Sequence, residues 1–185
     1  MSNVGYHGTG DVIKHIDHER FNHGDNALGP GFYITSNHKE ANYYAYTSSG
    51  SHPNVLKVHH DIKNPMSVGH QFSLDHIHQI IEHSGVKNPR AHAKMYHSMY
   101  QDKSNPTNGV DILNGIHQDF YHSKNAHKML HKVHEVTGHD GVRATTKDGD
   151  VHHVAWFPHQ VRSAISGQGL LKTSNKNRKS YPLSD

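Results

Sequence analysis

The segment LGPGFYITSNHKEANYYAY, Leu28–Tyr46, places a glycine-rich turn, a strand-like run and a helix-like run in direct succession. The run Gly31–Thr35 is rich in aromatic and β-branched residues, which favour a strand. Ser36 is a favoured helix N-cap residue, and alanine and tyrosine then recur at helical spacing as far as about Thr47. A turn, a strand bearing Tyr33 and a helix bearing further tyrosines together indicate a site that grips a flat ligand.

Strand patterns occur at both ends of the chain, and helical patterns lie between them. The predicted strands are Val4–His7, Gly31–Thr35, Asn54–Ile62, Gly141–Thr146 and Val151–Phe157, with a turn at Lys147–Gly149 that makes the last two a hairpin. The predicted helices start at Asp11, Ser36, Ser73 and Pro89 and continue through Ile112–Tyr121 and Ala126–Val136 to a stop at Gly138. These patterns predict an α+β fold in which a helical block, 73–137, separates the N-terminal strands from the C-terminal strands.

The composition is that of a water-soluble domain of ordinary size. The chain has 185 residues, of which 32% are hydrophobic, and no run approaches the roughly 18 apolar residues of a membrane span. It has no cysteine, which excludes disulfides and thiolate metal sites, and its N-terminus lacks the features of a secretory signal. We therefore expect one cytoplasmic domain, 1–166, followed by a flexible, polar and basic tail, 167–185.

Positive charge is concentrated in two parts of the chain, although the net charge is only +3. Residues 87–132 hold seven lysines and arginines against three acids, and residues 167–185 hold four against one. Such asymmetry indicates either a docking face for an anionic partner or an ordinary solvated helical surface followed by a tail.

Histidine accounts for 23 of the 185 residues. Zinc motifs with defined spacing, such as HExxH, are absent from the sequence. His127, His131 and His134 would share one face of a helix, but such coincidences are expected with so many histidines, so we predict no metal site. The composition does predict a net charge that rises steeply below about pH 6.5, where ordinary imidazoles take up protons.

Three separated patches carry a family resemblance: Tyr6–Thr9 (YHGT), Gly31–Tyr44 (GFYITSNHKEANYY) and Phe157–Val161 (FPHQV). In this order they resemble the diphtheria-toxin-like ADP-ribosyltransferases, the group that includes the poly-ADP-ribose polymerases. The segments GHDGVRA, 138–144, and HVAWFPHQVRSA, 153–164, are similar to a phage-associated branch found within polyvalent phage proteins. The helical block 73–137 carries no motif that we assign.

The resemblance implies a fold and a reaction. The fold would be a split pair of small sheets, with NAD as co-substrate in the cleft between them. The reaction would move one ADP-ribose unit from NAD to a macromolecular acceptor, breaking the nicotinamide–ribose bond through an oxocarbenium-like transition state. Tyr33 and Tyr43 would sandwich the nicotinamide ring. Gly8 and Thr9 would line the cofactor site, with room beside Gly8 for the carboxamide, and His7 would hydrogen-bond the ribose hydroxyls.

The third catalytic position departs from the family pattern, because familiar members carry a glutamate near the start of the last strand. Counting back from Gln160 puts His152 at that position, and the sequence has no glutamate after Glu135. Asp150 and His152 share one face of the predicted strand, since side chains alternate along a strand. His152, Asp150 and, third, Gln160 are the candidates to replace the glutamate. In this family its loss generally implies transfer of single units rather than polymer synthesis, and sometimes no transfer at all.

Three functions stay open at this point. The first is a mono-ADP-ribosyltransferase acting as a phage or bacterial effector in the host cytoplasm, on an acceptor that we expect to be protein, with nucleic acid as the alternative. The second is a catalytically silent module that binds NAD or ADP-ribose. The third is a basic, histidine-rich protein that binds nucleic acid or metal. Binding of NAD separates the first two from the third, and release of nicotinamide separates the first from the second.

Overall fold

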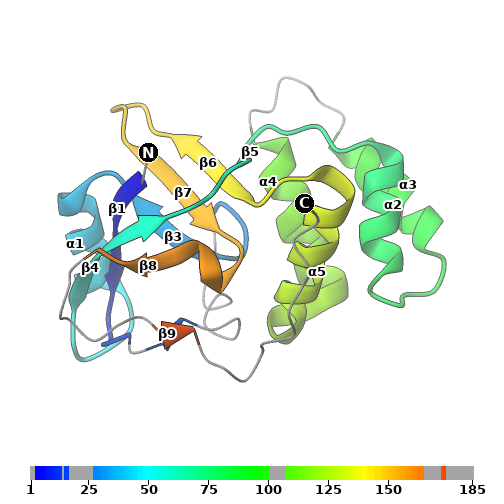
Figure 1. The fold of residues 1–185 in the computed structure, drawn as a ribbon. Helices are drawn as coiled ribbons and strands as arrows, with labels where there is room; N and C mark the ends of the chain where they lie inside the picture. Colours follow the sequence, from blue (N-terminus) through cyan, green and yellow to red (C-terminus); the bar gives the residue numbers. More distant parts are fainter. Residues whose placement is uncertain (1–2, 14, 17–26, 101–106, 165–171, 174–185) are drawn as a thin grey trace.

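The computed structural model describes residues 3–13, 15–16, 27–100, 107–164 and 172–173. The strands and the helix His38–Thr47 (α1) lie on one side of the molecule, and the remaining helices lie on the other (Figure 1). The chain therefore forms the predicted mixture of strands and helices, with strands from its two ends side by side. The part of the predicted flexible tail from 174 onward lies outside the described residues.

Seven strands form one sheet that joins the two ends of the chain. In spatial order they are β5 (Met66–Ser67), β6 (Gly141–Thr145), β7 (Val151–Ala155), β3 (Phe32–Thr35), β1 (Asn3–Thr9), β4 (Asn54–His60) and β8 (Val161–Ser163). All neighbours are antiparallel except β5 and β6, which are parallel. The predicted strands and the predicted hairpin, β6–β7, are therefore confirmed.

The register of β3 and β7 sorts their side chains between the two faces of the sheet. Tyr33 lies opposite Val154, and Thr35 lies opposite His152, so these four side chains share one face. That face packs against the helices through a core that includes Val142, Val154 and Trp156. The opposite face buries a second, smaller core of Phe32, Ile34, Val58, Ala155 and Val161.

The helical block starts and stops where the local sequence predicts. It consists of α2 (Leu74–Glu82), α3 (Pro89–Met99), α4 (Asn108–Ile116), the π-helix η2 (His117–Tyr121) and α5 (His122–Thr137). The Ser73 side chain caps α2 by accepting the backbone N–H of His76, and Pro89 is the first residue of α3. Gly138 ends α5 in the left-handed conformation, at φ 74°.

Apolar side chains and one buried hydroxyl hold this block together. Ile77, Ile80 and Ile81 on α2 are fully buried, which stabilises the fold by about 1.5–3 kcal/mol for each side chain. Tyr121, at the end of the π-helix, donates its hydroxyl hydrogen to the carbonyl of Ile80 over 2.5 Å. The segment from α4 to α5 is therefore tied to α2 by a directional bond as well as by packing.

Two local expectations are corrected. The predicted helix after Asp11 is wrong, because residues 11–13 are not helical and β2 (His15–Ile16) pairs in parallel with β9 (Lys172–Thr173). Ile16 is buried in the smaller core, and this tertiary contact outweighs a weak helical spacing. The N-cap of α1 is Asn37 rather than Ser36.

Candidate active site

The strands β1 and β3 are paired at a single position and then separate. Tyr6 lies opposite Thr35, whereas β1 pairs along its whole length with β4 on its other side. Just beyond Tyr6, the His7 ring donates from Nδ1 to the backbone carbonyl of Tyr33 over 2.7 Å. The same ring stacks on Phe32 with centroids 4.1 Å apart. The His7 side chain thus bridges the two strands where their backbones no longer pair.

This bond fixes the chemical form of His7. A carbonyl oxygen only accepts hydrogen bonds, so the hydrogen must be on Nδ1. Burial lowers the pKa of His7 to about 4, so the ring is neutral at pH 7 and Nε2 keeps its lone pair. Among the described residues none donates to Nε2, which makes it an acceptor ready for a ligand hydroxyl.

The glycine-rich turn before β3 is pinned by the hydroxyl of Tyr33. That hydroxyl accepts the N–H of Leu28 at 2.9 Å and donates to the carbonyl of Gly29 at 2.8 Å. Burial raises the pKa of Tyr33, so the hydroxyl keeps its proton at neutral pH. Gly31 is required next to this turn, since its φ is 151° and a Cβ there would meet Val154 Cγ1 at 2.3 Å.

Helix α1 is held directly against β1 at Gly8. A Cβ on Gly8 would lie 1.8 Å from the carbonyl oxygen of Ala41, so only glycine permits this approach. The close packing brings the first turns of α1 over β3, on the face that carries Tyr33 and Thr35.

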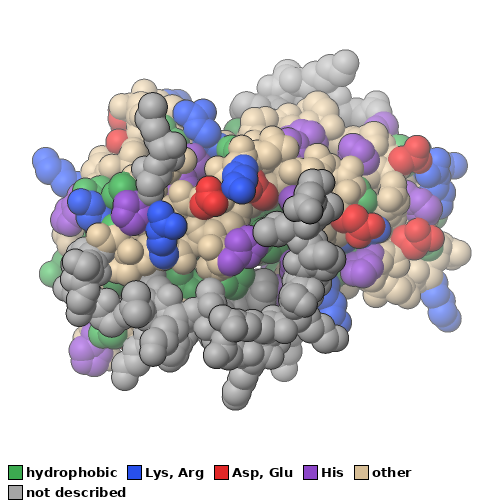
Figure 2. Space-filling model, in the orientation of Figure 1, with side chains coloured by type: hydrophobic (Ala, Val, Ile, Leu, Met, Phe, Trp, Pro, Cys, Tyr) green, Lys and Arg blue, Asp and Glu red, His purple; other side chains and the backbone are tan. Residues whose placement is uncertain are grey.

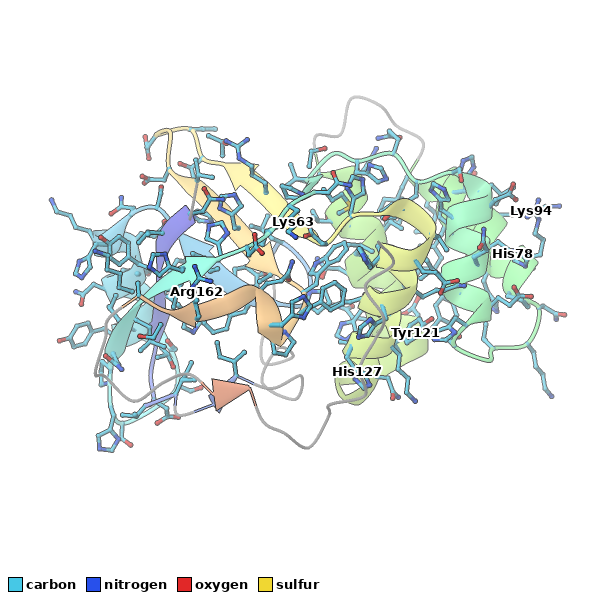
Figure 3. The ribbon with its side chains drawn as sticks, in the orientation of Figure 1. Lys63, His78, Lys94, Tyr121, His127 and Arg162 are labelled. Atoms are coloured by element: carbon cyan, nitrogen blue, oxygen red, sulfur yellow. The ribbon has the colours of Figure 1, made fainter. Side chains whose placement is uncertain are left out.

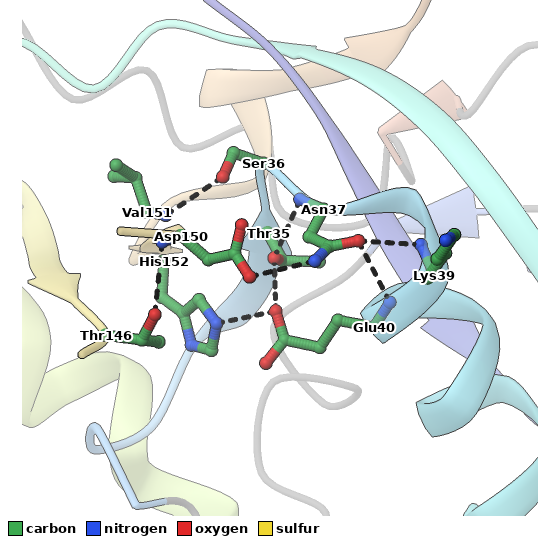
Figure 4. Close-up of polar contacts among 9 residues, drawn as sticks. All are labelled: Thr35, Ser36, Asn37, Lys39, Glu40, Thr146, Asp150, Val151 and His152. Carbon is green, nitrogen blue, oxygen red and sulfur yellow. Dashed lines mark hydrogen bonds and ion pairs between the residues drawn. The ribbon is translucent and has the colours of Figure 1, made fainter. Parts of the chain in front are cut away.

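A polar network joins the start of α1 to β3 and β7 (Figure 4). One carboxylate oxygen of Glu40, Oε2, accepts from Thr35 Oγ1 at 2.5 Å and bonds His152 Nε2 at 2.8 Å. Asn37 accepts the backbone N–H of Lys39 at 2.9 Å, and its amide donates to Asp150 Oδ2 at 2.8 Å. The N-terminal end of α1, the end of β3 and the β6–β7 hairpin therefore meet at this network.

The sequence profile of the ADP-ribosyltransferase domain in polyvalent proteins matches residues 2–170. The chain belongs to this family. The resemblance to the polyvalent branch is thus confirmed, and the match includes the helical block, to which we assigned no motif. No curated protein and no solved structure matches the chain.

In this member of the family, the predicted site residues lie in three settings. The His7 ring bonds the backbone carbonyl of Tyr33 and stacks on Phe32, whereas His152 lies on the sheet face of the Tyr33 side chain. Asp150 is bonded to Asn37 at the start of α1. Thr9 forms a turn with Asp11 through its hydroxyl at the end of β1.

Gln160 is occupied by the backbone of its own loop. Its side-chain oxygen accepts the N–H groups of Trp156 and Phe157 at 3.0 and 2.9 Å, and its amide donates to the carbonyl of Asp140 at 2.8 Å. The residue is 4% exposed. These bonds give Gln160 a structural role, so it no longer competes for the third catalytic position.

Tyr44 is the tyrosine of α1 that interacts electrostatically with both Glu40 and Tyr33. It lies four residues after Glu40, on the same side of the helix. Burial raises the pKa of Tyr44, and the neighbouring carboxyl of Glu40 raises it further. Tyr44 in turn contributes to the raised pKa of Tyr33. Its side chain is 49% exposed, and that of Tyr43 is 65% exposed.

Sequence reasoning did not single out Thr35 and Glu40, which bond in the network with His152, or Tyr44 beside Glu40. The spacing of Glu40 and Tyr44 was a usable signal, because residues four apart meet on one helix face. No comparable signal linked Glu40 to His152, which is 112 residues away in the chain.

Within the described ranges, no three His, Asp or Glu side chains gather as a metal site would require. In the same part of the chain, no helix is long and apolar enough to cross a bilayer.

Proposed function

We propose that the chain transfers a single ADP-ribose unit from NAD to a macromolecular acceptor and releases nicotinamide. Family membership supports ADP-ribosyl transfer, and the observation that carries the proposal for these residues is the bond from His7 Nδ1 to the Tyr33 carbonyl. It leaves a neutral imidazole with an acceptor nitrogen where β1 and β3 separate. A ribose hydroxyl is the donor that such a nitrogen would hold.

The aromatic part of the site suits the nicotinamide ring. In the proposed complex Tyr33 contacts one face of the ring and Tyr44, rather than Tyr43, contacts the other. Each aromatic contact contributes about 0.5–1.5 kcal/mol beyond burial. The hydroxyl of Tyr33 is already committed to the turn at Gly29, so its ring is held in place before a ligand binds.

The chemical step is the cleavage of the bond between nicotinamide and C1′ of the ribose. The bonding electron pair leaves with the nicotinamide nitrogen, and positive charge develops on C1′ and the ring oxygen. The acceptor nucleophile then attacks C1′ and gives up its proton where it carries one. Residues that hold the ribose in this strained arrangement speed the reaction through orientation and charge stabilisation.

The distribution of charge supports a protein acceptor over a nucleic acid. Arg90 and Lys132 of the basic segment are paired with Asp75 and Glu135, at 2.7 and 2.8 Å. Lys94 lies at the far end of the helical block, away from α1 (Figures 1 and 3). On the face in Figure 2, basic and acidic side chains are interspersed rather than gathered in a track.

The experiment is incubation of the chain with NAD, with nicotinamide measured by chromatography and NAD affinity by calorimetry. We expect release in the native chain and a loss of at least about tenfold in the His7→Ala variant. His83→Ala, an exposed histidine at the end of α2, is the matched control. Labelled NAD in lysate, followed by protease or nuclease, identifies the acceptor: label that survives protease and disappears with nuclease would overturn the choice of protein.

A catalytically silent NAD-binding module is the second candidate, because β7 carries His152 where a glutamate is usual. Stoichiometric NAD binding without any nicotinamide release would favour this reading.

A further inference from the structure

Glu40 occupies a helix position whose usual bond it does not make. It is the third residue of α1 after the N-cap Asn37, where a glutamate commonly turns back to accept the N–H of the cap residue. Here the N–H of Asn37 donates instead to Thr35 Oγ1 at 3.1 Å. The carboxylate of Glu40 is thereby left to face β3 and β7.

Two donors from adjacent strands hold one oxygen of this carboxylate. Thr35 and His152 are opposite each other in the β3–β7 register, and both bond Oε2 of Glu40. A carboxylate accepts, so His152 carries its hydrogen on Nε2 in this bond. Two bonds to a single oxygen restrict the rotation of the group and fix the direction of the other oxygen.

The second oxygen, Oε1, points away from both donors (Figure 4). No described residue donates to it. The Glu40 side chain is 22% exposed, so it is largely withdrawn from water and still accessible from one side. Tyr44, one turn further along α1, lies beside it.

We propose that Glu40 supplies the active-site carboxylate, from helix α1 instead of the last strand, and that its Oε1 accepts a hydroxyl of the nicotinamide ribose. The negative charge would stabilise the positive charge that develops on C1′ as nicotinamide leaves. Thr35 and His152 are then positioning residues, which act by aiming the carboxylate. The proposal rests on the proposed function and names the residue that completes that site.

The other carboxylate at this place is engaged elsewhere. Asp150 accepts the amide of Asn37 and so stabilises the start of α1. Asp150 is held by this one side-chain bond, whereas two donors hold Glu40, so Glu40 is the carboxylate whose direction is the more firmly fixed.

The test compares nicotinamide release, as kcat and KM for NAD, in the native chain and in Glu40→Gln. Glutamine keeps the shape and one acceptor oxygen, replaces the other oxygen by an NH2 group and removes the charge, so we expect kcat to fall about 100-fold with NAD affinity changed little. Glu82→Gln on α2, an exposed glutamate, should leave both parameters unchanged. Adding His152→Glu to Glu40→Gln returns a carboxylate from the strand side and should recover at least about tenfold of the loss.

A complex of the native chain with a non-cleavable carbocyclic NAD analogue gives an answer that does not depend on how a variant folds. We expect a Glu40 carboxylate oxygen within hydrogen-bond distance of a hydroxyl on the five-membered ring next to nicotinamide. A bound analogue with no contact to Glu40 would overturn the inference, as would full kcat in Glu40→Gln while the native chain is active. A native chain that releases no nicotinamide would overturn the proposed function and the inference together, so the two failures are distinguishable.

Discussion

The His7 ring donates from Nδ1 to the backbone carbonyl of Tyr33 over 2.7 Å, at the point where β1 and β3 stop pairing. A side-chain bond thus takes the place of a backbone hydrogen bond between β1 and β3. It also fixes the imidazole in the form that carries its hydrogen on Nδ1. It links the two sequence patches that first indicated a ligand site, and it does so without using the Nε2 lone pair.

The hydroxyl and the ring of Tyr33 have separable roles. Tyr33→Phe removes the bonds to Leu28 and Gly29, which should lower the free energy of unfolding by about 1–2 kcal/mol while NAD affinity stays within a few-fold. Tyr33→Ala also removes the ring and should weaken NAD binding by at least about 1 kcal/mol. Thermal unfolding and calorimetry measure the two effects. Equal NAD affinity in both variants would show that the ring does not contact the ligand.

Tyr44 and Tyr43 provide a matched pair on one helix. We expect Tyr44→Ala to weaken NAD binding by about 1 kcal/mol, because Tyr44 interacts electrostatically with both Tyr33 and Glu40. Tyr43→Ala, at a side chain that is 65% exposed, should leave the affinity unchanged. The reverse order of effects would restore Tyr43 as the ring that contacts nicotinamide.

Asp150 is expected to act on stability. Asp150→Ala removes the acceptor for the Asn37 amide at the N-cap of α1 and should cost about 1 kcal/mol of unfolding free energy. Because Asp150 does not hold the Glu40 carboxylate, kcat should stay within a few-fold of the native value. A loss of kcat as large as that of Glu40→Gln would return Asp150 to the catalytic group.

Acid should destabilise the fold before ordinary carboxylates titrate. Burial lowers the pKa of His7, His70 and His153 to about 4, whereas the same groups in the unfolded chain titrate near pH 6.5. The unfolded state therefore binds more protons between these values, and the free energy of unfolding falls as pH decreases from about 6.5 toward 4.

Thermal unfolding between pH 7 and pH 5 checks this expectation, with a fall in Tm on the order of several degrees. His70→Asn should make the dependence shallower, since one titrating group is removed. An exposed histidine such as His83 offers the control. A Tm that does not change with pH over this range would show that these rings accept protons as readily in the folded state.

Local chemistry made much of the fold predictable. Ser73, Pro89 and Gly138 mark helix ends through their own side chains or backbone, and the β6–β7 hairpin follows from its turn residues. By contrast, β2 consists of two residues whose conformation is decided by a partner strand, β9, far along the chain.

The candidate site also contains some residues that could be predicted from local sequence and others that could not. His7 and Tyr33 lie in recognisable motifs, so their place could be predicted from the sequence. Glu40 in a sequence reads as a helix-capping residue, and only the approach of His152, 112 residues later, turns it into part of a site. Which of two adjacent tyrosines faces that site depends on the rotation of α1, which the packing of Gly8 against Ala41 fixes.

The most direct test of the central claim is nicotinamide release from NAD by the native chain, measured beside His7→Ala and His83→Ala. We expect release by the native chain and by His83→Ala, a loss of at least about tenfold in His7→Ala, and thermal unfolding that shows all three to be folded. Absence of release from a folded native chain, or unchanged release in folded His7→Ala, would contradict it.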